Sequence, residues 1–293
     1  MLRITFLGTS GSVPTVERGM PAIALKYEKE LLLWDCGEST QRQMMKYKAG
    51  YGSVNAIFIS HSHLDHYLGI FGLLETLNLI AKPKYNIHLC AFEDLGKSLN
   101  ERYDFIEAHA LKNGVVYKGD GFVVEAFPVK HCRGAHGFIF RENDKIKFNE
   151  KKAHKLGLKG KMFTEIQKKG YVMIGKKKIK LEDVSWVKKG IKVVYSGDTS
   201  PCESLIKAAK DADLLVCEGT FDSSKKDEAK ERFHSTMEDA ANIAKKAKVK
   251  QLVITHISPR YADAKELKKF ENDAKKIFKN TVFAYDGMKV ELK

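Results

Sequence analysis

The chain has 293 residues, and its 51 Lys and Arg residues outnumber its 37 Asp and Glu residues, which gives a formal net charge of +14 at pH 7. A chain of this length can bury a substantial core as one large domain or two smaller ones. The positive charge favours a polyanionic partner, such as nucleic acid or a membrane surface. A lysine-rich but merely solvated surface is the alternative interpretation of this charge.

Cysteine usage argues against a protein held together by disulfides or a zinc ribbon, and hydropathy argues against a membrane-spanning protein. The five cysteines are odd in number and contain no C-x-x-C pair, so neither a disulfide framework nor a zinc ribbon is indicated. No apolar run approaches the roughly 20 residues that a membrane-spanning helix needs, and the apolar N-terminal segment is too short for a signal peptide. We therefore expect a soluble, cytoplasmic protein that does not associate with a membrane.

The pattern of apolar and turn-forming residues predicts strands and helices in alternation. In the first half, strands are expected at residues 2–7, 23–27, 31–35, 56–60, 87–91, 122–129 and 138–141, and helices at 40–48 and 69–79. In the second half, strands are expected at 192–196, 214–217 and 251–255, and helices at 201–210, 237–246 and 264–279. Pro201 suits the first position of its helix. Two halves of similar β/α character predict an α/β protein with a four-layer αββα sandwich.

Residues 141–188 differ in composition from the rest of the chain. They are rich in lysine, have glycines at positions 157, 160, 170 and 175, and contain only scattered apolar residues. We do not expect such a segment to form a core of its own. We interpret it as a basic arm inserted into a single domain of residues 1–293, with a mobile surface loop as the alternative. Its charge favours a role in binding.

The sequence His-Ser-His-Leu-Asp-His at residues 61–66 follows the apolar run of residues 55–60. Imidazoles and a carboxylate at this density are difficult to bury without a cation, and Zn²⁺, Mn²⁺ and Fe²⁺ accept such ligands. His61 and His63 point the same way if the chain is extended, as chelation of one ion requires. Asp65 and His66 lie just beyond and can hold a second ion. The motif therefore predicts a metal site at the end of a strand.

This motif also resembles the signature of the metallo-β-lactamase superfamily. The resemblance implies two β-sheets packed together, with helices outside and two metal ions between the sheet edges. By itself it implies a hydrolase and says little about the substrate.

Three more residues follow apolar runs and complete a dinuclear site. They are His131, Asp198 and His256. A carboxylate such as Asp198 can bridge two ions. The first ion would then have His61, His63 and His131 as its other ligands, and the second would have Asp65, His66 and His256.

The other histidines are interpreted differently. His136 is the alternative to His131, but its position beside Gly137 favours a role in the turn. His88, His109 and His154 lack neighbours of a suitable type, so we treat them as structural or surface residues.

Two metal ions about 3.5 to 4 Å apart can share a hydroxide and align a phosphodiester for displacement. Phosphodiester hydrolysis is therefore the reaction that this ligand set favours. Asp65 can accept the proton of the attacking water, and His234, oriented by Glu218, is the candidate donor for the leaving alkoxide. The alternative for His234 is a place beside a helix N-cap, since Ser235 or Thr236 precedes a helical run.

Five further motifs, which together span nearly the whole chain, resemble ribonuclease Z, the tRNA 3′-processing endoribonuclease family. They are residues 6–14 (Phe-Leu-Gly-Thr-Ser-Gly-Ser-Val-Pro), 34–43 (Trp-Asp-Cys-Gly-Glu-Ser-Thr-Gln-Arg-Gln), 196–199 (Ser-Gly-Asp-Thr), 234–236 (His-Ser-Thr) and 255–261 (Thr-His-Ile-Ser-Pro-Arg-Tyr). The resemblance implies that the seven ligands bind two zinc ions, although ligands without cysteine also admit manganese or iron. It implies the proton-transfer roles of Asp65, His234 and Glu218 given above.

The resemblance also implies a substrate and an assembly. Family members are typically homodimers that cut precursor tRNA after the discriminator base and leave a 3′-hydroxyl on the tRNA. The basic arm matches the position of the family's tRNA-gripping exosite, so we expect phosphate contacts from Lys159 and Lys161. Ser258 and Arg260, in the last motif, are also expected to contact the substrate.

The chain departs from the family pattern at three places. The His-Glu-Ala-Thr motif of the family is Cys-Glu-Gly-Thr at residues 217–220, so only Glu218 carries over. Gly19 replaces the asparagine of the Pro-x-x-x-Arg-Asn motif, and the arm lacks a Gly-Pro motif. The sequence therefore leaves open how the protein distinguishes tRNA 3′ ends that carry a trailer from those that carry CCA. Two alternatives remain: a phosphodiesterase or arylsulfatase-like hydrolase of small substrates, and an RNA-binding protein without catalysis.

Overall fold

The computed structural model describes residues 1–81, 83 and 86–293. The chain divides into two compact units, one formed by Met1–Arg141 with Ile191–Lys293 and the other by Glu142–Gly190. Across the described residues, no helix combines the length and apolar character needed to cross a membrane.

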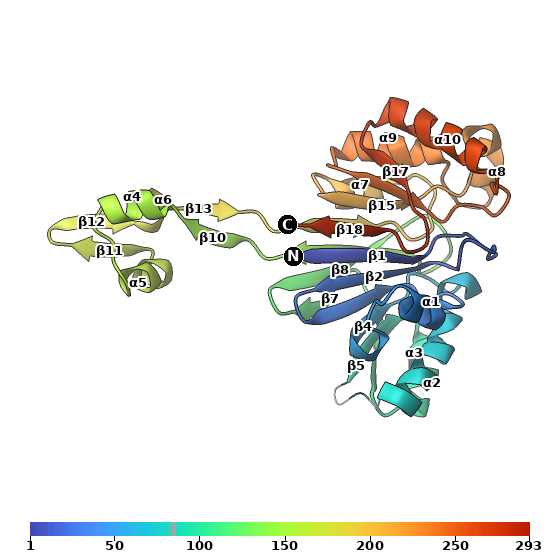
Figure 1. Cartoon of the computed structure of the whole chain (residues 1–293), viewed down its shortest axis with the longest axis horizontal. Helices are drawn as coiled ribbons and strands as arrows, with labels where there is room; N and C mark the ends of the chain where they lie inside the picture. The colour runs from blue at the N-terminus through green and yellow to red at the C-terminus, as the bar shows by residue number, and fades with distance from the viewer. Residues whose placement is uncertain (82, 84–85) are drawn as a thin grey trace. The chain divides into compact units, whose positions relative to one another are not determined.

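The larger unit contains two seven-stranded sheets (Figure 1). In spatial order, the first consists of β18 (Lys289–Leu292), β1 (Leu2–Gly8), β2 (Ala22–Tyr27), β3 (Glu30–Trp34), β4 (Val54–Phe58), β5 (Ile87–Ala91) and β6 (Ile106–Ala110). The second consists of β17 (Thr281–Phe283), β16 (Leu252–Thr255), β15 (Leu214–Glu218), β14 (Lys192–Tyr195), β9 (His136–Glu142), β8 (Phe122–Pro128) and β7 (Gly114–Gly119). Strands β3 to β6 are parallel, as are β14 to β17.

Helices cover the outer face of each sheet, which completes four layers (Figure 1). Those beside the first sheet are α1 (Thr40–Lys46), α2 (Gly69–Thr76) and α3 (Glu93–Arg102), and those of the second are α7 (Glu203–Ala209), α8 (Lys226–Glu231), α9 (Met237–Ala247) and α10 (Ala264–Ile277). Short helical turns lie at Tyr51–Ser53, Leu64–His66, Leu77–Ala81 and Ser223–Lys225. The arrangement confirms the predicted αββα sandwich.

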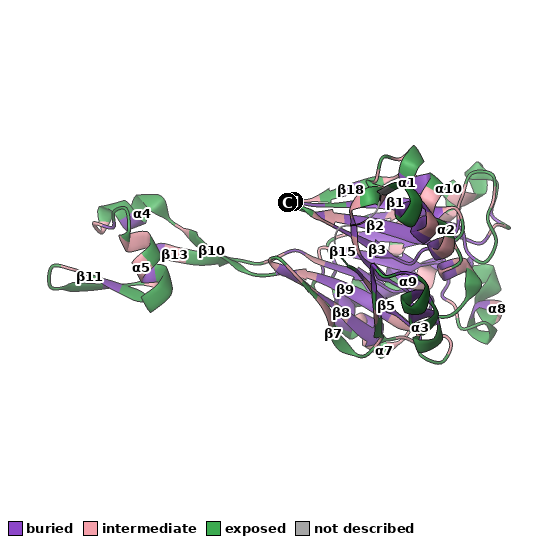
Figure 2. Cartoon of the chain, turned by 90° about the horizontal axis from the view of Figure 1, so that it is seen from below, coloured by how far each residue is buried: buried purple, intermediate pink, exposed green. Residues whose placement is uncertain are grey.

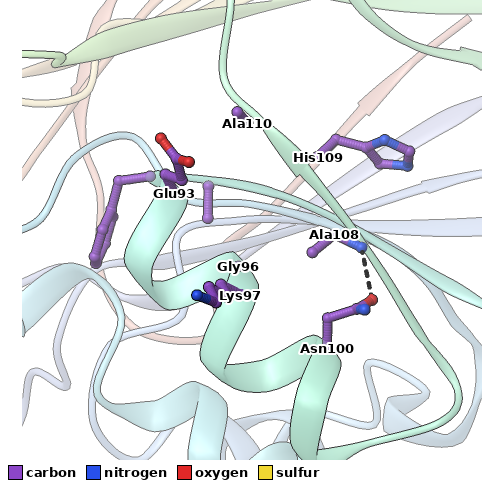
Figure 3. Close-up of a pocket in the computed structure, with 9 residues that line it drawn as sticks. Glu93, Gly96, Lys97, Asn100, Ala108, His109 and Ala110 are labelled. Carbon is purple, nitrogen blue, oxygen red and sulfur yellow. Dashed lines mark hydrogen bonds between the residues drawn. The ribbon is translucent and has the colours of Figure 1, made fainter.

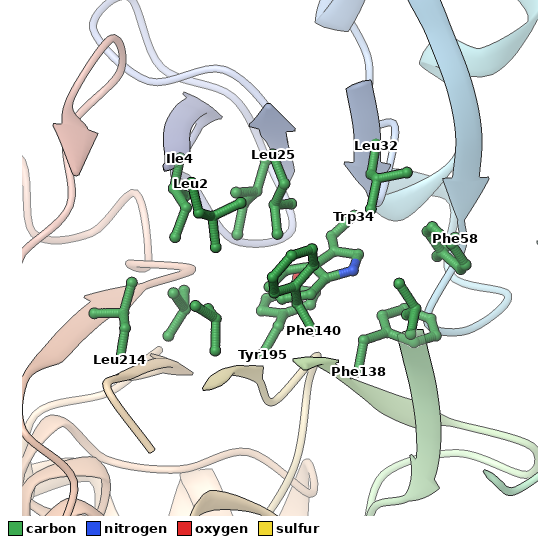
Figure 4. Packing of buried hydrophobic residues seen from close by; sticks show 14 of the residues in the cluster. Leu2, Ile4, Leu25, Leu32, Trp34, Phe58, Phe138, Phe140, Tyr195 and Leu214 are labelled. Atoms are coloured by element: carbon green, nitrogen blue, oxygen red, sulfur yellow. The ribbon is translucent and has the colours of Figure 1, made fainter. Parts of the chain in front are cut away.

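Alternation along the strands explains why two layers of core form, one between the sheets and one beneath the helices. On β3, Leu32 and Trp34 point into the inter-sheet core, whereas Leu31 and Leu33 pack under the helices of the first sheet. Figure 4 shows Trp34 facing Tyr195 of the opposite sheet, and their rings stack with centroids 5.7 Å apart. Figure 2 shows that the buried residues concentrate on both sheets.

Some local predictions were wrong. Helix α7 begins at Glu203, not at Pro201, because Cys202 is extended (φ −146°, ψ 153°) and occupies the N-cap. The helix predicted at residues 69–79 is confirmed, although it is α-helical only to Thr76 and π-helical from Leu77 to Ala81. Helix α3 and strands β6, β7, β17 and β18 had not been predicted.

The smaller unit, Glu142–Gly190, has a core of its own. Its elements are β10 (Lys145–Phe148), α4 (Glu150–Lys155), α5 (Met162–Lys169), β11 (Tyr171–Ile174), β12 (Lys177–Lys180), α6 (Leu181–Val184) and β13 (Ser185–Lys188). Strand β10 pairs with β13, and β11 pairs with β12. The core side chains are Ala153, Leu158, Ile166, Val172, Ile179 and Val184. The expectation that this segment lacks a core was therefore wrong, because its few apolar residues converge from the helices and the hairpin.

Candidate metal centre

Polar residues gather where strands of both sheets end. His61 lies three residues beyond the end of β4, Asp198 three beyond the end of β14, and His256 directly after β16. Because the C-terminal ends of parallel strands meet at one edge of a sheet, the topology brings residues that are distant in the sequence together.

The first group contains His61, His63, His131 and Asp198, whose ligand atoms all lie within 4.8 Å of one another. His63 Nδ1 and His131 Nε2 are 3.0 Å apart. His61 Nε2 and His131 Nε2 lie 3.8 and 3.9 Å from Asp198 Oδ2. These are the four residues expected around the first ion.

The second group contains Asp65, His66, Asp198 and His256. Asp198 Oδ2 is 3.2 Å from His66 Nε2 and 3.3 Å from His256 Nε2. Asp65 Oδ2 is 3.5 Å from both of these nitrogens. One carboxylate oxygen of Asp198 therefore belongs to both groups, as a bridging ligand would.

Hydrogen bonds at the opposite ring nitrogen hold four imidazoles with Nε2 directed into the centre. Nδ1 of His66 donates to Asp35 Oδ2 at 2.7 Å, and Nδ1 of His131 donates to the Phe233 carbonyl at 3.0 Å. Nδ1 of His61 and His256 are 2.9 and 2.8 Å from the hydroxyls of Ser60 and Thr220. Such outer contacts fix the tautomer and the ring orientation of metal-ligating histidines.

Besides their spacing, buried polar atoms without hydrogen-bond partners indicate that these residues can hold a cation. Within the described part of the chain, His61 Nε2 and Asp198 Oδ1 are buried without a hydrogen-bond partner. Buried polar atoms are rarely left in this state, and a metal ion is a common reason for it. Burial and the neighbouring His66 hold the pKa of His61 well below its usual value, so this imidazole is neutral and free to ligate.

Electrostatics keep both carboxylates ionised. Burial raises the pKa of Asp198, but His256 and His66 lower it more, so it lies well below its ordinary value. Burial also raises the pKa of Asp65, and its hydrogen bond with His256 and the nearby His66 reverse this effect. Both side chains are therefore available as anionic ligands.

The N-terminal loop contacts the second group of ligands. The Ser12 amide donates to Asp65 Oδ2 at 3.0 Å, and the Gly11 amide bonds the Ile257 carbonyl beside His256. A Cβ atom on Gly11 would lie 2.6 Å from His256 Nδ1, so only glycine allows this approach. The glycine-rich turn of the sequence thus positions two ligands.

Glu218 and His234 form a pair next to the centre. Glu218 Oε1 is 2.9 Å from His234 Nδ1, and the His234 ring centroid is 4.9 Å from that of His131. Helix α9 begins after the N-cap Thr236, whose hydroxyl bonds the Asp239 amide, so His234 also lies near a helix N-cap, as the alternative expected. Burial lowers the pKa of His234, but Glu218 raises it more, to about 9. The imidazole is therefore protonated at neutral pH.

The remaining predicted residues lie elsewhere. His136 Nδ1 bonds the Gly134 carbonyl within its own turn and belongs to neither ligand group. Ser258 is buried and accepts from Arg260 Nε, and both terminal nitrogens of Arg260 bond Glu228 at 3.0 and 2.9 Å. Lys159 and Lys161 are exposed in the smaller unit.

Two residues that support the ligands were not predicted. Asp35 is buried and accepts hydrogen bonds from Ser60 and Tyr195 as well as from His66. Thr220 connects His256 to Glu218, since its hydroxyl donates to Glu218 Oε2 at 2.6 Å. Asp35 directly follows β3, so the rule that found Asp198 and His256 could also have found it.

The fold and the paired ligand groups define a metallo-β-lactamase fold protein. The structure of YhfI from Bacillus subtilis, titled a metallo-beta-lactamase fold protein, matches 99% of this chain and 100% of its own with a TM-score of 0.72 at 18% identity. Human tRNase Z, short form, matches 99% of both chains with a TM-score of 0.70 at 26% identity.

Sequence comparison gives the family. The ribonuclease Z of Methanosarcina acetivorans is 42% identical over 100% of this chain and 98% of its own length, and that of Archaeoglobus fulgidus is 40% identical over the same shares. A family model described as anti-Pycsar protein Apyc1 also matches residues 2–278. The chain belongs to the ribonuclease Z family and is an endoribonuclease, which confirms the resemblance seen in its motifs.

Proposed function

We propose that this protein uses two zinc ions to cleave precursor tRNA on the 3′ side of the discriminator base, leaving a 3′-hydroxyl on the tRNA. The observation that carries the proposal is the shared position of Asp198 Oδ2 in two groups of ligand atoms. Seven residues would hold the ions: His61, His63, Asp65, His66, His131, Asp198 and His256. The relatives named ribonuclease Z and tRNase Z support RNA as the substrate class.

When bound, the two ions would lower the pKa of a water molecule and neutralise charge on the scissile phosphate. The chain's own groups would move the protons. Asp65, held by the Ser12 amide, is ionised and can accept a proton from the attacking water. His234, kept protonated by Glu218, can donate a proton to the leaving oxygen.

Cleavage of a precursor tRNA with a defined trailer, followed by mapping of the new ends, tests the proposal. Wild-type protein loaded with zinc should release the trailer in one cut after the discriminator base, and the tRNA product should accept ligation at its 3′-hydroxyl. Failure to cut any precursor tRNA would refute the proposed substrate.

The smaller unit is the proposed tRNA-binding arm. Residues 142–190 contain fifteen lysines and six acidic residues, a net charge of +9 out of +14 for the chain. Lys159 and Lys161 are exposed on the turn between α4 and α5 and can reach phosphates. Contacts of this kind position a nucleic acid without reading its sequence, and they weaken steeply with salt.

Removing the arm should weaken tRNA binding selectively. Arg141 of β9 and Lys192 of β14 are register partners, so a short Asn-Gly linker in place of residues 142–190 can rejoin the two strands as a hairpin. We expect KM for precursor tRNA to rise by at least about tenfold, because several phosphate contacts are lost. Measured kcat/KM at several salt concentrations should also show a shallower salt dependence than in wild type.

Hydrolysis of bis(p-nitrophenyl) phosphate provides the control for this deletion. This small diester is expected to contact the metal centre alone. The variant that lacks residues 142–190 should therefore hydrolyse it at a rate near that of wild type. A deletion variant that binds precursor tRNA as tightly as wild type would contradict the role of the arm.

The pH dependence of cleavage should report the protonation state of His234. Because Glu218 raises the pKa of His234 to about 9, the donor stays protonated until pH rises through that value, and cleavage should then decline. In Glu218→Gln the raising charge is gone while burial still lowers the pKa, so the decline should begin at lower pH. Rate profiles from pH 6 to 10, with an NMR titration of His234 in both proteins, check this. Identical alkaline limbs would show that His234 is not the donor.

We further propose a cytoplasmic homodimer, as the family resemblance implies. Light scattering of the purified protein would give the mass in solution, against 33.1 kDa for one chain. Elemental analysis of protein purified without chelators would distinguish zinc from manganese or iron, which the same nitrogen and oxygen ligands accept.

A further inference from the structure

A third group of metal-ligating side chains lies outside the centre described above. It contains His88 of β5 and Glu107 and His109 of β6. The strands are parallel neighbours with His88 in register with Glu107, and Glu107 and His109 are two residues apart, on one face of β6. Figure 3 shows the His109 ring on the opposite side of its strand from Ala108, which faces α3. Strand pairing alone therefore assembles the group.

Two imidazole nitrogens and the two oxygens of one carboxylate lie close together. His88 Nδ1 is 3.3 Å from His109 Nε2, and the two Glu107 oxygens lie 3.6 Å from His88 Nδ1 and 3.3 Å from His109 Nε2. Ligand atoms around a tetrahedral Zn²⁺, with bonds of about 2.0 to 2.2 Å, are about 3.3 to 3.6 Å apart. The three distances fall within this range, so the two imidazoles and the carboxylate are spaced as ligands of one ion would be.

A hydrogen bond between the imidazoles accounts for only one edge of this group. The nitrogen-to-nitrogen distance of 3.3 Å fits such a bond and also fits shared ligation of one ion. It equals the 3.3 Å between His66 Nε2 and His256 Nε2 in the main centre. In the part of the chain that the structure describes, the ion-pair partners of Glu107 are these two imidazoles alone.

We propose that His88, Glu107 and His109 bind a single divalent transition-metal ion, with Zn²⁺ as the model ion. Two imidazoles and one carboxylate suit Zn²⁺, Cu²⁺ or Ni²⁺ rather than Mg²⁺ or Ca²⁺. The side chains are between 34% and 47% exposed, so an ion can enter, and water completes the coordination. The site shares no residue with the main centre and does not depend on the proposed RNA substrate.

Zinc titration of the holoprotein tests the proposal. Protein without a polyhistidine tag is loaded with zinc and desalted, and further Zn²⁺ is added against a competing chromophoric chelator. We expect one additional equivalent per chain in wild type. Its dissociation constant should rise at least tenfold in His88→Ala and in His109→Ala. Glu107→Gln, which keeps the side-chain shape but removes the charge, should weaken binding to a smaller extent.

His154→Ala provides the matched control, because His154 is an exposed histidine of the smaller unit and should leave the additional equivalent unchanged. Circular dichroism of each variant verifies that the sheet is intact, and Glu107→Gln tests the site with the least disturbance of β6. In wild type, Zn²⁺ should broaden or shift the NMR signals of the His88 and His109 rings together, and Mg²⁺ should not. Absence of the extra equivalent, or its survival in a His88→Ala/His109→Ala double variant, would overturn the proposal.

Discussion

Asp198→Ala should abolish precursor tRNA cleavage and metal retention together. Asp198 Oδ2 lies between 3.2 and 3.9 Å from four imidazole nitrogens, those of His61, His66, His131 and His256. Without this anion both proposed ions would lose a ligand and part of the negative charge that would offset their own. We expect kcat/KM to fall by at least about 10²- to 10³-fold, the range seen when one preorganised electrostatic contact is removed.

Two measurements and a control variant separate this effect from general damage to the fold. Elemental analysis should find less than the wild-type metal content, and added zinc should raise the melting temperature less in the variant than in wild type. Asp211→Asn is the matched control, since Asp211 is exposed and its φ of 55° suits asparagine. Wild-type metal content in Asp198→Ala would refute the bridging role of this carboxylate.

Where one local rule applied, the sequence predicted the layers and the residues that the fold brings together in the two groups. Short continuous apolar runs indicated strands such as β3 and β14, and polar residues that follow such runs indicated His61, Asp198 and His256. Helix α3 was missed because Leu95 and Leu99 are almost its only apolar side chains. Pro201 was assigned to a helix because proline favours the first helical position, but here the chain is still extended at Cys202.

Contacts that depend on register or on distant partners could not be predicted. His88 and His109 are 21 residues apart, and nothing in their spacing shows that β5 and β6 are parallel and in register. Thr220 supports His256 from another strand end, and its sequence neighbours give no sign of this. The core of the smaller unit was missed for a similar reason, because six apolar residues that are scattered along the sequence come together only in the folded structure.

Asp35→Ala should cost both stability and metal affinity, although Asp35 belongs to neither ligand group. Its buried carboxylate accepts four hydrogen bonds, from the amide and hydroxyl of Ser60, from the Tyr195 hydroxyl and from His66 Nδ1. Removal leaves these donors unpaired in the interior, and loss of one partner of a buried charged pair costs about 3 to 5 kcal/mol. His66 also loses the contact that fixes its tautomer, so we expect metal affinity to fall about 10- to 100-fold.

A graded series makes this prediction specific. Tyr195→Phe removes one of the four hydrogen bonds and should cost only about 1 kcal/mol, with metal affinity nearly unchanged, because His66 keeps its partner. Asp35→Asn keeps the shape and tolerates the φ of 56°, but it loses the charge, so its effects should be intermediate. Urea unfolding and zinc competition titrations check the order. If Asp35→Ala matched Tyr195→Phe in zinc affinity, His66 would be oriented by packing alone and Asp35 would have only a structural role.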